Sequence, residues 1–148
     1  QFQKSYDKYL TDKQYNSQIP LKTIVEKGGI LCGSSDSPVQ DINPWIQIHG
    51  MVNFPIEKEQ LSVFQAISTY TYNAAYSTFE ENERGTLSIG KWADFIILDR
   101  DPFHIPKDSL IDVKVLDTYI QGKNNNKMNY NFTKFMIKSL FSGNKKKI

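Results

Sequence analysis

Cysteine and histidine are scarce in this sequence of 148 residues. It contains one cysteine, Cys32, and two histidines, His49 and His104. A single cysteine excludes a disulfide bond within the chain, and these three side chains leave no self-contained metal site of the Cys/His type. Because Cys32 lies in an apolar run, we expect a buried and unreactive thiol. The two histidines match no pattern of metal ligands, and we expect ordinary surface or partly buried positions for both.

The sequence also lacks long apolar runs and a strong net charge. No run of about 18 apolar residues occurs, which excludes a transmembrane helix. The net charge is +2, so no strong field favours binding to nucleic acid or to a membrane. The chain opens on Gln1 without the pattern of a signal peptide, and we therefore expect a cytoplasmic protein. An opening glutamine in place of methionine leads us to expect a cut piece or a processed product.

The hydrophobic spacing predicts a series of short helices. Pro20 suits the first turn of a helix, and Asn43 followed by Pro44 is a capped helix start. Ser62, with Gln65 three positions later, forms a capping box. The predicted helices cover residues 2–15, 20–27, 44–54, 62–70, 71–79 and 132–141.

Two segments in the second half of the chain predict a pair of strands. Residues 95–98 form an apolar run bounded by Asp94 and Asp99, which predicts a buried strand. We expect these two carboxylates to accept hydrogen bonds from backbone N–H groups at the strand ends. Residues 113–121 alternate in polarity and predict a strand that pairs with the first and ends at Gly122.

A third apolar run, Ile30 to Cys32, stops at small residues and then presents an acid. The next residues are GSSDSP, in which the acid is Asp36. A short buried strand that delivers a carboxylate to its open end would have this pattern, and the acid would then have a chemical role. An ordinary turn is the alternative, because Asp, Ser and Pro are common turn residues.

Three segments in this order resemble the C-terminal part of the amidohydrolase superfamily, closest to the branch that includes N-substituted formamide deformylases. The first is GSSDSPV at 33–39, and the third is VKVLDTYIQGK at 113–123. The second, at 66–102, is the most specific: it contains T-x-N-x-A and then G-x-L-x-x-G-x-x-A-D-F-x-x-L-D-x-D-P.

The resemblance implies an α/β fold in which a (β/α)8 barrel is flanked by a small β-sandwich built from strands of both chain ends. Such a barrel needs about 250 residues, so this chain is expected to be a C-terminal fragment of it. Residues 1–83 would hold the last barrel strand and helices, and residues 84–123 the sandwich strands. Residues 124–148 would form a polar linker, an amphipathic helix and a basic tail.

The resemblance also implies a role for Asp36. It matches the family's aspartate after barrel strand eight, which binds the metal, takes a proton from the metal-bound water and passes it to the leaving amine. A metal lowers the pKa of bound water to about 7, and a nearby carboxylate is suited to carry the proton. Ser34, Ser35 and Ser37 are small and polar, which makes Ser35 and Ser37 candidates for contact with a substrate.

The implied activity is hydrolysis of non-peptide C–N bonds in small amides or cyclic amides, with zinc or a similar divalent metal in the full-length parent. The family's histidine ligands have no counterpart in this chain. We therefore expect the chain alone to bind no catalytic metal and to be inactive. The alternative is a non-catalytic regulatory or scaffold module derived from the same fold.

Two further expectations concern partners. Lys145, Lys146 and Lys147 could contact nucleic acid or acidic lipid, which a steep salt dependence of binding would reveal, but a solvated tail is the simpler interpretation. We expect no nucleic-acid and no membrane partner. A strand at 30–32 without its barrel neighbours would have unpaired edges, and exposed edges favour association. We therefore expect a homo-oligomer.

Overall fold

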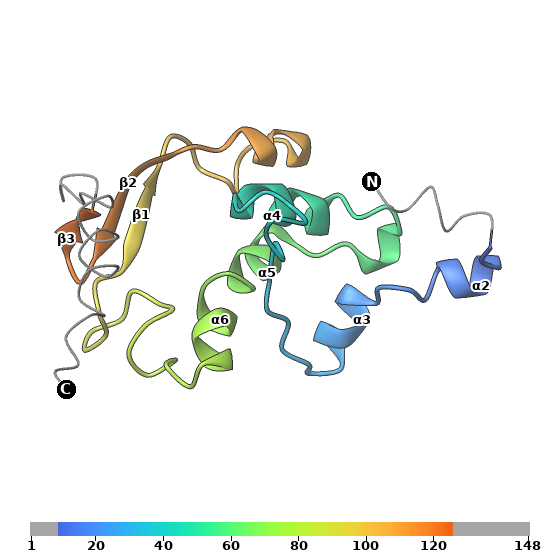
Figure 1. Ribbon diagram of the computed structural model, residues 1–148, viewed down its shortest axis with the longest axis horizontal. Helices are drawn as coiled ribbons and strands as arrows, with labels where there is room; N and C mark the ends of the chain where they lie inside the picture. Colours follow the sequence, from blue (N-terminus) through green and yellow to red (C-terminus); the bar gives the residue numbers. More distant parts are fainter. Residues whose placement is uncertain (1–8, 126–148) are drawn as a thin grey trace, which may run out of the picture.

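The computed structural model describes residues 9–125, which combine short helices with a small antiparallel sheet (Figure 1). The helices lie at one end and in the middle of an elongated molecule, and the sheet lies at the other end. In chain order the elements are α2 (Asp12–Tyr15), α3 (Leu21–Glu26), α4 (Pro44–Val52), the 3-10 helix η1 (Glu57–Glu59), α5 (Val63–Ser68), α6 (Tyr72–Ser77), β1 (Phe95–Leu98), the 3-10 helix η2 (Lys107–Asp112), β2 (Val115–Ile120) and β3 (Lys123–Asn124). None of the helices in this part of the chain is long and apolar enough to cross a membrane.

The helix starts predicted for α4 and α5 are confirmed. The Asn43 side chain accepts a hydrogen bond from the Trp45 N–H at 3.1 Å, and Pro44 stands at the first position of α4. At α5 the side chains of Ser62 and Gln65 form the reciprocal capping box. These caps satisfy N–H groups that have no partner inside the helix, which explains why both helices begin at these residues.

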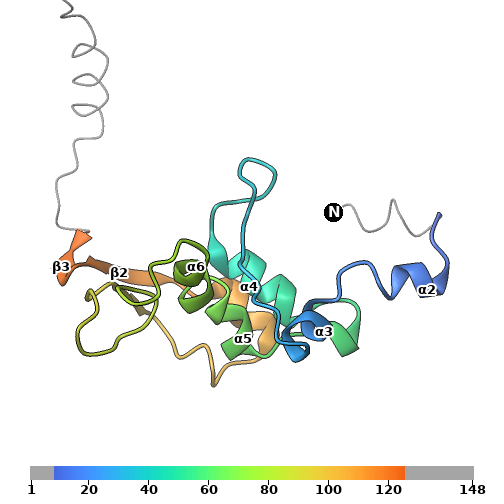
Figure 2. The same cartoon turned by 90° about the horizontal axis from the view of Figure 1, so that it is seen from below.

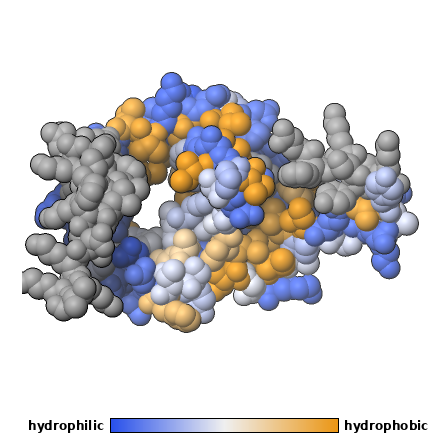
Figure 3. Space-filling view, viewed as in Figure 1, coloured by the Kyte–Doolittle hydropathy of each residue, from blue (hydrophilic) through white to orange (hydrophobic). Residues whose placement is uncertain are grey.

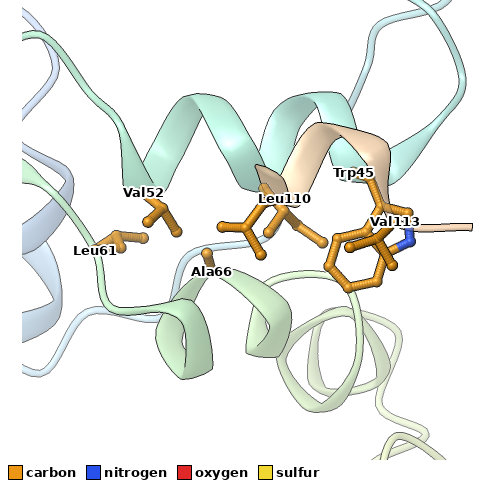
Figure 4. Close-up of a cluster of buried hydrophobic side chains, with 7 residues drawn as sticks. Trp45, Val52, Leu61, Ala66, Leu110 and Val113 are labelled. Carbon is orange, nitrogen blue, oxygen red and sulfur yellow. The ribbon is translucent and has the colours of Figure 1, made fainter. Parts of the chain in front are cut away.

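A hydrophobic core joins α4, α5 and η2 (Figure 4). Its buried residues are Trp45, Ile48, Val52, Leu61, Ala66, Leu110 and Val113. Leu110 and Val113 come from the connection between the first two strands, so this connection closes a core that α4 and α5 begin. Burial of apolar area, at about 25 cal/mol per Å², thus ties the sheet to the helices.

The sheet has the strand order β1-β2-β3 with antiparallel neighbours. The predicted pairing of residues 95–98 with the alternating segment is therefore confirmed. Asp99 accepts a hydrogen bond from the Lys114 N–H at 2.9 Å, and Asp94 accepts one from the Gln121 N–H at 2.8 Å. The two carboxylates have the structural role that was expected of them. The short third strand was not predicted, because two residues carry no pattern.

Two predicted strands differ from the structure. Residues 30–32 form no strand: Ile30 is 47% exposed and the Cys32 thiol is exposed. A strand needs a neighbour to pair with, and within residues 9–125 the only sheet is the one at the far end of the molecule. Residues 95–98 do form a strand, but Ile96 and Ile97 remain 48% and 40% exposed. The described chain covers this sheet only in part.

Several predictions lie wholly or partly outside the described residues. The helix at 2–15 is represented by Asp12–Tyr15 alone, and the helix at 132–141 and the basic tail lie beyond residue 125. The mixed α/β composition agrees with the predicted class. The derivation from a barrel, and the division into 1–83, 84–123 and 124–148, stay predictions.

Candidate functional site

Asp36 stands in the loop between α3 and α4, which projects from the helical part of the molecule (Figure 2). It begins a turn in which the Val39 N–H donates to the Asp36 carbonyl at 2.8 Å, and the Asp36 N–H donates to the Ser34 hydroxyl at 3.2 Å. Its φ of 49° is left-handed, a conformation that aspartate adopts more readily than most residues. The residue is exposed. The loop thus presents this acid to solvent on a defined turn.

The segment that leads to this turn is fastened to the junction of α5 and α6. The Asn73 side-chain amide donates to the Leu31 carbonyl at 2.8 Å. The Cys32 thiol donates to the Asn73 main-chain carbonyl at 3.1 Å. The Gly33 N–H donates to the Thr69 carbonyl at 3.0 Å. Although no strand forms, residues 31–33 therefore have a defined position.

The sequence does not predict these contacts of Asn73 and Thr69. The available signal was the asparagine of the T-x-N-x-A motif, which spans residues 71–75. A polar side chain inside an otherwise helical segment often has a partner elsewhere, but the motif does not say where. The partner is a main-chain carbonyl in a different part of the sequence, which only the folded chain brings close.

Gly33 lies directly against the aromatic ring of Tyr70. A Cβ atom at Gly33 would come within 2.2 Å of Tyr70 Cε2, so a side chain at this position would displace the ring or the loop. The Tyr70 hydroxyl is buried and has no hydrogen-bond partner among the described residues. Burial, which disfavours the phenolate, raises the pKa of Tyr70 above its ordinary value.

Two cavities border this region. The first has a volume of about 800 Å³ and lies between the loop and α4; Ser34, Asp41, Gln47 and Tyr70 are among its lining residues. Of the predicted site residues, Asp36, Ser35 and Ser37 do not line it. Figure 3 shows the molecule hollowed between the sheet and the helices, where a second cavity of about 750 Å³ is lined by residues of α6 and β1. The structure therefore separates the predicted acid from both cavities.

No complete metal centre is formed by residues 9–125. Within this range no three His, Cys, Asp or Glu side chains are close enough to hold an ion. His49 lies half-buried on α4, and His104 Nδ1 lies 2.6 Å from Asp101 Oδ2 in a loop. A protein site for zinc uses at least three protein ligands. Asp36 offers one suitable carboxylate, and further donors would have to come from outside the described residues.

A buried carboxylate with a structural role lies elsewhere, on η1. Glu59 is buried, and its side chain accepts hydrogen bonds from the Thr23 N–H at 2.9 Å and from the Thr23 hydroxyl at 2.6 Å. These bonds, the hydroxyl first, lower the pKa of Glu59. Thr23 belongs to the first turn of α3, which has no side-chain cap from Pro20. Glu59 therefore caps α3 from a different element.

Comparison with known proteins agrees with the resemblance found in the sequence. Residues 3–124 match the profile described as the amidohydrolase family. The chain is 34% identical over 112 residues to YtcJ of Bacillus subtilis, which is named as an amidohydrolase. It is 26% identical over 118 residues to the N-substituted formamide deformylase of Arthrobacter pascens, and 34% identical over 112 residues to the protein LONG AFTER FAR-RED 3 of Arabidopsis thaliana.

These alignments cover 69%, 75% and 70% of this chain but 21%, 22% and 19% of the three relatives. The chain thus spans about a fifth of the length of the curated relatives it matches. No solved structure matches it significantly. The matched residues 3–124 include the Asp36 turn, the helices that fasten it and the whole sheet. The chain therefore belongs to the amidohydrolase family.

Proposed function

We propose that this chain is the C-terminal part of a metal-dependent amidohydrolase that hydrolyses a non-peptide C–N bond in an amide or cyclic amide. In this proposal Asp36 is both a metal ligand and the proton shuttle. The observation that carries it is the exposed Asp36 turn at the end of a fastened segment, in a chain of the amidohydrolase family. The names of two relatives, an amidohydrolase and an N-substituted formamide deformylase, support the class of reaction.

The proposed chemistry assigns two proton transfers to Asp36. When bound, a divalent metal supplies a water molecule whose pKa is lowered to about 7. The Asp36 carboxylate accepts the proton that the attacking water loses. It then donates that proton to the nitrogen as the C–N bond breaks, so that the amine leaves as a neutral molecule. The exposed position on a turn leaves room for both contacts, and Ser35 and Ser37 stand on either side for contact with the substrate.

Asp36→Asn in the full-length protein tests this role. Asparagine keeps the shape but cannot carry the proton, so kcat should fall by about 100-fold or more, and the amount of bound metal should fall as well. The matched control is Asp41→Asn, which makes the same chemical change in the same exposed loop and should leave kcat within a few-fold. A full kcat in the Asp36→Asn protein would contradict the proposal.

The alternative is a regulatory or scaffold protein that has kept the fold without the chemistry. One observation favours it: the Arabidopsis relative has a name that does not describe an enzyme. The coding sequence upstream of Gln1 separates the two functions. A His-x-His pair with two later histidines supports the hydrolase, and their absence supports the scaffold. For the hydrolase we propose a cytoplasmic location and a small-molecule amide substrate.

A further inference from the structure

Residues 31–33 lead to Asp36, and their position depends on contacts with the junction of α5 and α6. Among residues 9–125 no strand lies beside them, so they lack the ladder of hydrogen bonds that would hold a barrel strand. In its place are the bonds to Asn73 and Thr69. The bond from the Asn73 amide is the shortest of these contacts, at 2.8 Å.

The geometry leaves little freedom between this anchor and the acid. The Tyr70 ring lies so close to the Gly33 backbone that a Cβ atom at residue 33 would come within 2.2 Å of Tyr70 Cε2. Only Ser34 and Ser35 separate Gly33 from Asp36, and the Ser34 hydroxyl accepts the Asp36 N–H. A shift of the Leu31 carbonyl is therefore transmitted along the backbone to the Asp36 carboxylate.

We propose that Asn73 is a positioning residue, which sets the location of the Asp36 carboxylate by holding the Leu31 carbonyl. The inference rests on the proposed function, because it matters only where Asp36 acts in the reaction. Asn73 itself touches no substrate. Its amide transmits the position of α6 to the loop, and α6 is in turn held by close packing, because a Cβ at Gly85 would come within 2.8 Å of Ala75 Cβ.

Asn73→Ala in the full-length protein removes this bond and tests the inference. We expect kcat to fall about 100-fold with KM nearly unchanged, because a displacement of a reacting group by about 1 Å costs this much. The rate is measured well below the unfolding temperature, so that loss of folded protein does not contribute. Asn73→Asp keeps the shape of the side chain without the amide donor, so it should show the same fall in kcat with nearly unchanged KM. This variant replaces Asn73→Ala in the test if the alanine variant folds poorly.

The matched control is Asn53→Ala. The Asn53 amide also donates to a distant main-chain carbonyl, that of Lys107 at 3.1 Å, but it lies at the end of α4 away from the Asp36 loop. Its loss should lower the unfolding temperature and leave kcat unchanged. Hydrogen exchange gives a second readout. In Asn73→Ala the backbone amides of a peptide covering residues 31–36 should exchange roughly tenfold faster or more, because loss of the anchor makes local opening of this segment more frequent. In Asn53→Ala the same peptide should exchange at the wild-type rate.

The outcomes separate the inference from the proposed function. If Asp36→Asn is inactive and Asn73→Ala keeps a normal kcat, the positioning role is overturned and the proposed function stands. An equal loss of kcat in Asn73→Ala and Asn53→Ala also overturns it, because the effect is then one of general stability. If Asp36→Asn is fully active, the proposed function fails, and the inference fails with it.

Discussion

At the scale of a residue, the missing side chain of Gly33 decides how the loop meets the helices. The sequence marks this glycine only as the point where an apolar run stops. In the structure, the Tyr70 ring, at the junction of α5 and α6, occupies the space that a Cβ atom at Gly33 would need. Glycine is therefore required here because there is no room for a side chain, and not because the backbone has an unusual φ. It could not be predicted, because a local pattern carries no information about a ring that is distant in sequence.

Gly33→Ala should destabilise the chain by about 1–3 kcal/mol, since the added methyl group overpacks the contact with Tyr70. Gly50→Ala is the matched control. Gly50 lies within α4, and no atom lies within 4 Å of a Cβ added there, so alanine should stabilise the helix by about 0.5–1 kcal/mol. Urea unfolding of both variants and the wild type measures the difference. Equal unfolding midpoints for the two variants would refute the steric role of Gly33.

At the scale of an element, α3 shows that a short helix can obtain its cap from a different part of the chain. The sequence predicted α3 correctly from Leu21 and its apolar partners. It did not reveal that the N–H of Thr23 would be satisfied by Glu59 of η1. In contrast, α4 and α5 are capped by adjacent residues, and both caps were predicted. Local caps can be recognised in a sequence, and remote caps cannot.

The Glu59 cap should make the stability of the chain depend on pH. The pKa of Glu59 in the folded chain is below its ordinary value of 4.5, chiefly because the Thr23 hydroxyl and N–H donate to the carboxylate. A carboxyl whose pKa is lowered on folding contributes stability above its unfolded pKa, and this stability is lost as pH falls through the folded pKa. Glu59→Gln should therefore be less stable than wild type at neutral pH and nearly equal to it in acid.

Thermal unfolding of both proteins from neutral pH to below pH 4.5 measures this effect, since 4.5 is the ordinary value for the group. Glu57→Gln is a suitable control, because Glu57 is an exposed glutamate of the same 3-10 helix. A constant difference between wild type and Glu59→Gln at every pH would show that the ionised cap does not contribute.

At the scale of the whole molecule, the sheet has an exposed apolar face. Ile96 lies opposite Thr118, and residues opposite each other share a face of an antiparallel pair. Ile120 occupies the same face by alternation, and Ile96 and Ile120 are 48% and 46% exposed. Leu116 lies at the register shift opposite Ile97 and Leu98 and is 55% exposed. Contiguous apolar surface of this kind favours association. No strand forms at residues 30–32, so their edges give no ground for association. The oligomer stays a prediction, which now depends on the exposed face of the sheet.

We predict that the isolated chain self-associates through this face. Ile96→Lys should shift the population toward monomer in light scattering across a wide concentration range, because a charge on the face opposes its burial. Ile42→Lys adds the same charge at a 78% exposed residue of the Asp36 loop and should leave the association unchanged. A monodisperse wild-type monomer over the whole range would contradict the prediction.

Patterns in the sequence determined most of the elements: the caps of α4 and α5, the pairing of 95–98 with the alternating segment, and the structural roles of Asp94 and Asp99. The caps depend on neighbours within a few residues. The strands and the carboxylates at their ends follow from an apolar run and an alternating segment that the sequence shows directly. Only the tertiary structure decided that residues 30–32 form no strand and that residues 31–33 are fastened by Asn73 and Thr69. A strand exists only with a partner, and a remote side chain finds its carbonyl only when the chain has folded.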